Sequence, residues 1–264
     1  MRNLRILFLL LLALPMACGC GSKGRSKRIE IPEPDRYTYR IVKEYPHARN
    51  AYTQGFVFHK GILWEGTGEY GGSEIRTLNL NDGSYFTEAT LPDSEFGEGI
   101  TIHNNYLYQL TWTENVCHVY SIETGAKVRD FRYIGEGWGL TTDGEKLYLS
   151  DGSAKIFKIN PENFRREGSV TVTYKGQPVD YINELEWIEG KIWANVYLTD
   201  QILIIDPATG RAEGVVELEG ILPDSLRDET TDVLNGIAYD AATKRILITG
   251  KKWPKIYEIE LIKQ

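Results

Sequence analysis

The segment EGITIHNNYLYQLTW, residues 98–112, has four relatives elsewhere in the same chain, and this repetition decides the fold. The five copies start at residues 54, 98, 138, 183 and 235, so that 40 to 52 residues separate successive starts. Self-similarity at such a period is typical of repeat architectures. The other four copies read QGFVFHKGILWEGTG, WGLTTDGEKLYLSDG, NELEWIEGKIWANVY and NGIAYDAATKRILITGK.

Each copy has the pattern of a small β-sheet. An apolar pair stands nine and ten residues after the start, slightly later in the fifth copy: Leu63-Trp64, Leu107-Tyr108, Leu147-Tyr148, Ile192-Trp193 and Ile246-Leu247. A third apolar segment follows, and turn sequences such as NDG, DGE and ATG separate the segments. Four short antiparallel strands that recur at this period predict propeller blades. We therefore expect an all-β fold, a five-bladed β-propeller. The alternative, an all-β sandwich with coincidental spacing, does not explain five aligned copies.

The two ends of the repeat array complement each other. The last copy reaches Gln264 after three strands, whereas YTYRIVKEY at 37–45 precedes the first copy without a blade of its own. We expect this N-terminal strand to close the fifth blade, because closure removes an open sheet edge. Residues 37–264 then form the propeller domain, and a closed ring without a free edge predicts a monomer.

The first 36 residues differ in composition from the repeats. MRNLRILFLLLLALPMAC combines two arginines, an apolar run and small residues, which is the pattern of a secretory signal; an uncleaved membrane anchor is the alternative. The cysteines after the run resemble a bacterial lipobox, with Cys18 or Cys20 as the lipidated residue. We expect a lipoprotein-type signal peptide at 1–20 and a flexible tether at 21–36. The protein is then exported and anchored in a membrane by its lipid, facing the periplasm or the cell surface.

Composition restricts the class of partner. The chain has 264 residues, 42% of them hydrophobic, and 30 Lys+Arg against 37 Asp+Glu, so nothing in its charge indicates nucleic-acid binding. Cys117 is the one cysteine inside the repeats, so we expect no internal disulfide and a packing role for its thiol. No HExxH or comparable metal-ligand spacing connects the four histidines His47, His59, His103 and His118.

The first residues of the copies form a column: Gln54, Glu98, Trp138, Asn183 and Asn235. In a propeller this position begins the innermost strand, where side chains converge on the axis at one mouth of the channel. The positions two residues later stay apolar, as a packed core requires: Phe56, Ile100, Leu140, Leu185 and Ile237. The column is polar and differs between copies, so we interpret it as a site with Glu98 as its carboxylate. The alternative is a surface glutamate at a strand end.

Nine short motifs occur in order along the chain: AYTQGF, FGEGI, YQLTW, GWGLTTDG, SDGSA, YINELEW, IWANVYLTD, LNGIAYD and TGKKWPKIYEI. Together they resemble the glutamine cyclotransferases of the plant and bacterial type, from about residue 37 to the C-terminus. The resemblance implies a five-bladed propeller that converts the N-terminal glutamine of a peptide or protein to pyroglutamate and releases ammonia. It also implies catalysis without a metal or other cofactor, unlike the zinc-dependent animal enzymes with the same activity.

The resemblance also assigns roles. It makes Glu98, within FGEG, the essential acid, because one carboxylate between two nitrogens can act first as general base and then as general acid. The family's polar partners fall on Gln54, Asn183 and Lys251, which would donate to the developing oxyanion. From the sequence alone, Lys251 could equally belong to an exposed Lys-Lys pair.

The remaining predicted site residues form the pocket wall. Trp112 and Trp138 would pack against the glutamine side chain, although either tryptophan alone could be core. Asn235 completes the column as a substrate-binding residue. Tyr197 stands where relatives often have tryptophan, a departure that alters the wall.

Two other functions use the same channel mouth. A propeller glycosidase needs two carboxylates about 5 to 9.5 Å apart; Glu184 and Glu186 are near in sequence, but strand alternation directs Glu184 away from the face of Asn183. A non-catalytic binding propeller would need no ionisable group at its centre.

Overall fold

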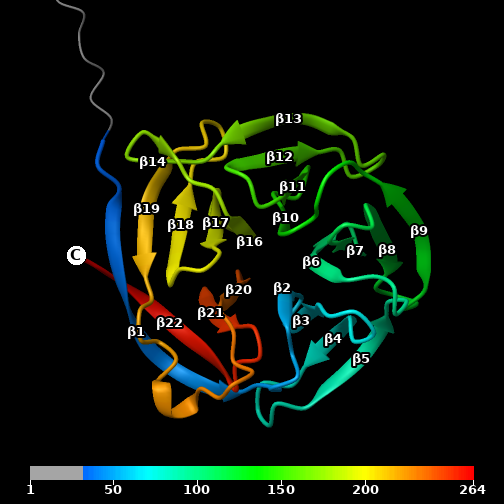
Figure 1. Cartoon of the computed structure of the whole chain (residues 1–264), viewed down its shortest axis with the longest axis horizontal. Coiled ribbons are helices and arrows are strands. Elements are labelled where there is room, and N and C mark those ends of the chain that lie inside the picture. Colours follow the sequence, from blue (N-terminus) through cyan, green and yellow to red (C-terminus); the bar gives the residue numbers. More distant parts are fainter. Residues whose placement is uncertain (1–31) are drawn as a thin grey trace, which may run out of the picture. The chain divides into compact units, whose positions relative to one another are not determined.

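The computed structural model describes residues 32–264, which form a ring of β-sheets around a central axis (Figure 1). Blade 1 contains β2 (Thr53–His59), β3 (Ile62–Thr67), β4 (Glu74–Leu78) and β5 (Tyr85–Thr90). Blade 2 contains β6 (Gly97–His103), β7 (Tyr106–Thr111), β8 (Val116–Ser121) and β9 (Lys127–Arg132). Blade 3 contains β10 (Leu140–Thr142), β11 (Leu147–Ser150), β12 (Lys155–Ile159) and β13 (Arg166–Thr171). Consecutive strands of each blade pair antiparallel, so the repeats are blades as predicted.

Blades 4 and 5 complete the five-bladed propeller. Blade 4 contains β16 (Ile182–Ile188), β17 (Lys191–Val196), β18 (Gln201–Ile205) and β19 (Ala212–Glu217). Blade 5 contains β20 (Leu234–Asp240), β21 (Arg245–Gly250), β22 (Lys255–Lys263) and the N-terminal β1 (Asp35–Pro46). A short hairpin, β14 (Thr173–Tyr174) with β15 (Gln177–Pro178), and the 3₁₀-helix η1 (Asp224–Leu226) lie in connections between blades.

Strand β1 closes the ring, which confirms the prediction. It pairs antiparallel with β22 from Tyr37–Lys263 to Pro46–Lys255. β1 begins two residues before the expected domain start, and residues 35–37 also pair in parallel with residues 214–216 of β19. This second pairing was not predicted. It joins blades 4 and 5 into one sheet of eight strands, because β1 has 12 residues and is longer than the other strands of its blade.

The core consists of five apolar clusters, one between each pair of neighbouring blades. The cluster between blades 1 and 2, for example, packs Trp64 and Ile75 against Ile100 and Leu107. The five predicted core positions are all buried: Phe56, Ile100, Leu140, Leu185 and Ile237. Cys117 is a buried free thiol in the cluster between blades 2 and 3, as expected.

The glycine that follows the column residue lets the innermost strands approach each other. A Cβ added to Gly99 would lie 2.6 Å from the carbonyl oxygen of Trp138 in the next blade. At Gly55 and Gly139 a Cβ would overlap the backbone of Ile100 and Asn183 in the same way. Side chains are therefore excluded where the blades meet near the axis.

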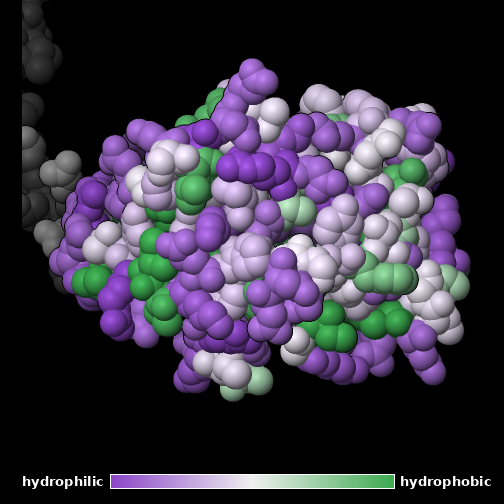
Figure 2. Space-filling view, turned by 90° about the horizontal axis from the view of Figure 1, so that it is seen from below, coloured by the Kyte–Doolittle hydropathy of each residue, from purple (hydrophilic) through white to green (hydrophobic). Residues whose placement is uncertain are grey.

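The side of the ring seen in Figure 2 is mainly hydrophilic, with small apolar groups between the polar residues. Within residues 32–264, no helix has the length and apolar character that a membrane span requires. The predicted signal peptide, Cys18, Cys20 and most of the predicted tether lie outside the described residues.

Candidate active site

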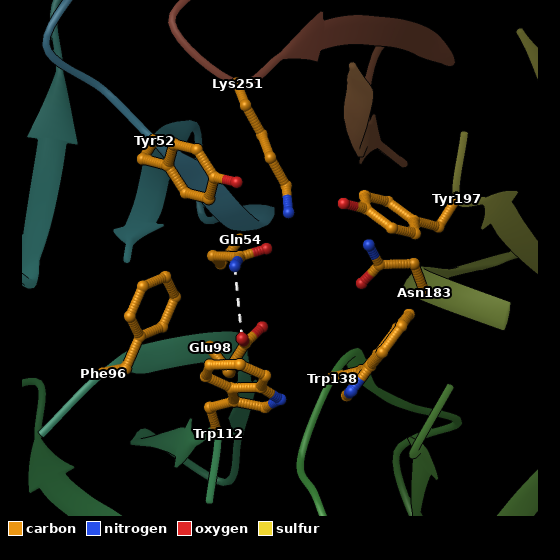
Figure 3. Close-up of a pocket in the computed structure, with 9 residues that line it drawn as sticks. All are labelled: Tyr52, Gln54, Phe96, Glu98, Trp112, Trp138, Asn183, Tyr197 and Lys251. Carbon is orange, nitrogen blue, oxygen red and sulfur yellow. Dashed lines mark hydrogen bonds between the residues drawn. The ribbon is translucent and has the colours of Figure 1, made fainter. Parts of the chain in front are cut away.

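A cavity of about 270 Å³ lies at one end of the innermost strands, and all five blades contribute to its lining. Nine side chains converge on it (Figure 3): Tyr52, Gln54, Phe96, Glu98, Trp112, Trp138, Asn183, Tyr197 and Lys251. Seven of the eight residues predicted for catalysis or substrate binding are in this set. The structure thus brings together residues that lie up to 199 positions apart in the chain.

Three of the column residues that line the cavity lie where the innermost strand bulges. Gln54, Glu98 and Asn183 are each the second residue of an innermost strand, and the pairing register shifts at each of them. A β-bulge bends the strand locally and re-aims a side chain, and such bulges are common beside active sites. These three copies of the repeat therefore share both the innermost strand and the bulge near its start.

Asn235, the fifth column residue, does not line the cavity. It is fully buried behind Gln54, and its Nδ2 donates to Gln54 Oε1 at 3.3 Å and to the carbonyl oxygen of Thr53 at 2.9 Å. Gln54 Nε2 in turn donates to Glu98 Oε1 at 3.1 Å (Figure 3). Asn235 thus orients the Gln54 amide so that its N–H group faces the carboxylate.

Glu98 is buried, with 5% of its surface exposed. Burial raises the pKa of its carboxyl well above the ordinary value, while the nearby positive charge of Lys251 acts in the opposite direction. The negative charges of Glu136 and Glu114 raise the pKa further. The carboxylate form of Glu98 is therefore a stronger base than that of an exposed glutamate.

Lys251 is buried rather than exposed, with 4% of its surface accessible. Its Nζ lies 4.7 Å from the ring centroid of Tyr52 and 5.2 Å from that of Tyr197, so two aromatic faces hold the ammonium group. Burial lowers the pKa of Lys251, and Glu98 and Asp232 oppose this shift. The backbone of Lys251 is fixed by hydrogen bonds to Val233 and Asp232.

Tyr52 and Phe96 in the lining, and Glu136 beside it, are not predicted from the sequence. Each lies two residues before a column residue, so the alternation of a strand could have indicated them. Phe96 packs edge-on against Trp112, with ring centroids 5.8 Å apart. Glu136 Oε2 accepts a hydrogen bond from Nε1 of Trp112 at 2.7 Å and from Nε1 of Trp138 at 2.8 Å. One carboxylate oxygen therefore holds both tryptophan walls.

The other carboxyls near the axis have a different environment. Glu184 accepts hydrogen bonds from the backbone N–H groups of Phe56 and Ile237, at 3.2 and 3.0 Å, and Glu186 accepts one from Tyr239 at 2.9 Å. The predicted separation of Glu184 from the face of Asn183 is confirmed. Among the nine lining residues Glu98 is the single carboxylate, whereas a glycosidase needs a pair.

Metal ligands are not grouped in the described part of the chain: residues 32–264 contain no cluster of three His, Cys, Asp or Glu side chains placed to hold an ion. His47 contacts Glu65 where blades 5 and 1 meet, and His118 lies between Glu95 and Asp130 in blade 2. The chemistry that the pocket itself offers is proton transfer by one carboxyl beside polar donors and aromatic walls.

Fold and pocket define a five-bladed propeller with a pocket on its axis, in which Glu98 is the one carboxylate of the lining. The sequence profile described as Glutamine cyclotransferase matches residues 10–261. The chain is 37% identical to a glutaminyl-peptide cyclotransferase of Arabidopsis thaliana over 227 residues, 84% of this chain and 70% of the relative. The crystal structure of Myxococcus xanthus glutaminyl cyclase superposes with a TM-score of 0.82 at 39% identity, covering 88% of this chain and all of that one. The chain belongs to the glutamine cyclotransferase family and is a homologue of glutaminyl-peptide cyclotransferases.

Proposed function

We propose that the pocket cyclises the N-terminal glutamine of peptides or proteins to pyroglutamate, with release of ammonia and without a metal. The observation that carries the proposal is the buried Glu98 carboxyl, hydrogen-bonded by Gln54 and paired electrostatically with Lys251 inside a cavity sized for one residue. A binding module would not need a desolvated acid at this position, because burying a carboxyl costs stability.

Glu98 performs both proton transfers in this mechanism. The α-amino nitrogen of the substrate attacks the carbon of the γ-carboxamide, a C–N bond forms, and Glu98 accepts the proton that the amine loses. Glu98 then gives this proton to the amide nitrogen, the original C–N bond breaks, and ammonia leaves. The reaction needs no external acid or base, so a single carboxyl with a raised pKa is sufficient.

Donors around Glu98 stabilise the oxyanion that forms on the carboxamide oxygen. Lys251 of blade 5 supplies a positive charge, and Asn183 of the neighbouring blade 4 supplies an amide group (Figure 3). The Oδ1 atom of Asn183 has no hydrogen-bond partner among the described residues, which leaves an acceptor for a substrate N–H group. Gln54 fixes the direction of the Glu98 carboxylate.

The aromatic walls hold the aliphatic part of the glutamine side chain. Trp138 packs edge-on against Tyr197 with ring centroids 5.7 Å apart, and Trp112 closes the cavity beside Phe96. These rings exclude water from the reacting groups, which strengthens the electrostatic interactions among Glu98, Lys251 and the substrate.

We also propose that the enzyme works outside the cytoplasm as a monomeric lipoprotein, facing the periplasm or the cell surface. The N-terminal sequence supports this, with its arginines, apolar run and adjacent cysteines. Labelling cells with a fatty-acid analogue is expected to modify the wild-type chain and to fail in either Cys18→Ala or Cys20→Ala, which identifies the lipidated residue.

The decisive experiment measures ammonia release from Gln-Ala by wild type and Glu98→Gln. The variant keeps the size and polarity of the side chain but cannot accept the proton, so kcat should fall by roughly 10² to 10⁴. Glu186→Gln is the matched control, because Glu186 is also buried but lies outside the pocket; it should retain wild-type turnover. Near-normal turnover in Glu98→Gln would exclude the mechanism.

Dialysis against a strong chelator tests the metal-independent part of the proposal. Activity on Gln-Ala should stay unchanged, since the acid–base step is assigned to Glu98. A loss that added zinc restores would assign the protein to a different mechanistic class.

A further inference from the structure

The pocket is too small for more than the end of a peptide. At about 270 Å³ it lies below the range of pockets that enclose drug-sized ligands. In the proposed reaction the glutamine fills this cavity, and the residues that follow it must lie on the surface around the mouth. Tyr181 and Leu198 are two exposed side chains beside the lining residue Tyr197, which makes them candidates for contact with these residues.

Tyr181 occupies a repeat position that carries pocket side chains in other blades. It lies two residues before Asn183, as Tyr52 and Phe96 lie two residues before Gln54 and Glu98. Its ring centroid is 6.4 Å from that of Tyr197, a lining residue. Unlike Tyr52 and Phe96, however, Tyr181 is 54% exposed.

Leu198 follows the pocket residue Tyr197 directly. It is 65% exposed and lies in a tight turn in which the N–H group of Thr199 donates to the carbonyl oxygen of Val196 at 3.1 Å. Leu198 also lines a neighbouring hollow of about 290 Å³ together with Asp232, whose carboxylate accepts the hydroxyl of Tyr52 at 2.9 Å. Leu198 is therefore adjacent in sequence to the lining residue Tyr197 and shares a hollow with Asp232, the partner of the lining residue Tyr52.

Both residues have left-handed backbone conformations, with φ of +66° at Tyr181 and +65° at Leu198. The backbones are linked, since the N–H group of Tyr197 donates to the carbonyl oxygen of Tyr181 at 2.9 Å. Glycine or asparagine adopts this conformation more easily than tyrosine or leucine. Bulky apolar side chains that are both strained and exposed contribute little to folding, and such strain is concentrated at functional sites.

We propose that Tyr181 and Leu198, the blade 4 shelf, bind the side chain that follows the N-terminal glutamine and favour peptides with a large apolar residue at that second position. The inference rests on the proposed function. The two side chains are exposed and lie beside the lining residue Tyr197. A second-position side chain that packs against them removes apolar surface of the peptide and of the shelf from water.

The test compares kcat/KM for Gln-Phe and Gln-Ala in wild type and in Leu198→Gly, Tyr181→Gly and the double variant. Wild type should prefer Gln-Phe by roughly fivefold, which is less than the 10- to 200-fold of an enclosed apolar pocket. Each single variant should reduce the preference and the double variant should abolish it, while turnover of Gln-Ala is unchanged. Melting temperatures should be unchanged or higher, since glycine relieves the left-handed strain.

Lys244→Gly is the matched control. Lys244 also has a positive φ, +58°, but lies in the turn between β20 and β21 and outside the pocket lining. This variant should keep the wild-type preference for Gln-Phe.

The possible outcomes distinguish a failure of the shelf inference from a failure of the proposed function. If wild type turns over both dipeptides equally, or if the double variant keeps the preference, the shelf inference is overturned while the cyclase activity stands. If neither dipeptide releases ammonia, the proposed function fails and the inference fails with it. A wild-type dimer in sedimentation that the double variant converts to a monomer would assign the shelf to a second copy of the chain instead.

Discussion

At the scale of single residues, the site is a chain of oriented amides that ends at one acid. Asn235 fixes Gln54, and Gln54 fixes Glu98. The acid is held in one direction without a charged partner in hydrogen-bond contact, and Lys251 acts on it through space. Burial keeps the pKa of Glu98 above its ordinary value although Lys251 acts in the opposite direction, and the proposed mechanism uses this carboxyl first to take up and then to release a proton.

Lys251→Ala tests the electrostatic role. We expect kcat on Gln-Ala to fall by about 10²-fold and KM to change less, because an oxyanion donor acts mainly in the transition state. The acidic limb of the pH profile should move to higher pH, since Lys251 lowers the pKa of Glu98. Lys252→Ala removes a lysine that is bonded to Glu69 and does not belong to the pocket lining. This variant should leave kcat and the position of the acidic limb unchanged. A change confined to KM would make Lys251 a substrate anchor.

Glu136 positions the two tryptophan walls, and two substitutions distinguish its role as a hydrogen-bond acceptor from the effect of its negative charge. Glu136→Ala removes the shared acceptor, so KM should rise by roughly tenfold, equivalent to about 1.4 kcal/mol. Glu136→Gln keeps an acceptor oxygen and should restore most of the affinity. It should also move the acidic limb of the pH profile to lower pH, because the negative charge of Glu136 raises the pKa of Glu98. Equal KM values in all three proteins would contradict the positioning role.

At the scale of elements, β1 does more than add one strand. Its pairing with β22 completes blade 5, and its first residues bind β19 of blade 4. Tyr45 of β1 is also buried in the cluster between blades 5 and 1. The strand thus contacts structure on both sides of the ring closure.

Deleting Asp35–Pro46 from a chain that begins at residue 32 should therefore lower the melting temperature by roughly 10 °C or more, or prevent folding. Deletion exposes the edge of β22 and one side of the cluster that contains Tyr45. A synthetic peptide of residues 35–46 added in trans should restore part of the loss. If the shortened domain has the same melting temperature as the intact one, the pairing of β1 does not contribute to the stability of the ring.

At the scale of the whole molecule, the axis holds three buried carboxyls with two different roles. Glu98 faces the pocket, whereas Glu184 and Glu186 bind backbone N–H groups of the innermost strands in blades 1 and 5. Burial raises the pKa of Glu186 to about 8, and burial together with Glu186 raises that of Glu184. The backbone hydrogen bonds that the two groups accept connect the blades and act against this rise.

The raised pKa values of Glu184 and Glu186 make the stability of the fold depend on pH. A carboxyl whose pKa is raised in the folded state stabilises the fold fully below its unfolded value of about 4.5, and this contribution is lost as the pH rises through 8. The free energy of unfolding should therefore fall between pH 5 and pH 8, by about 1.4 kcal/mol per pH unit for each carboxyl that stays protonated. Glu186→Gln should make the slope shallower in urea unfolding. An unchanged slope in the variant would exclude Glu186 as its source.

The blades, the core positions and the place of Glu98 in the pocket could all be predicted from the sequence. Period-two alternation and a repeat of 40 to 52 residues are local properties, and a repeated position has one location in a propeller. Tertiary structure alone decided how the blades meet at the axis. It placed Asn235 behind Gln54, buried Lys251 between two rings, joined Trp112 and Trp138 through Glu136, and paired β1 with β19. These contacts connect different blades, so they depend on distances across the closed ring that no local pattern of residues specifies.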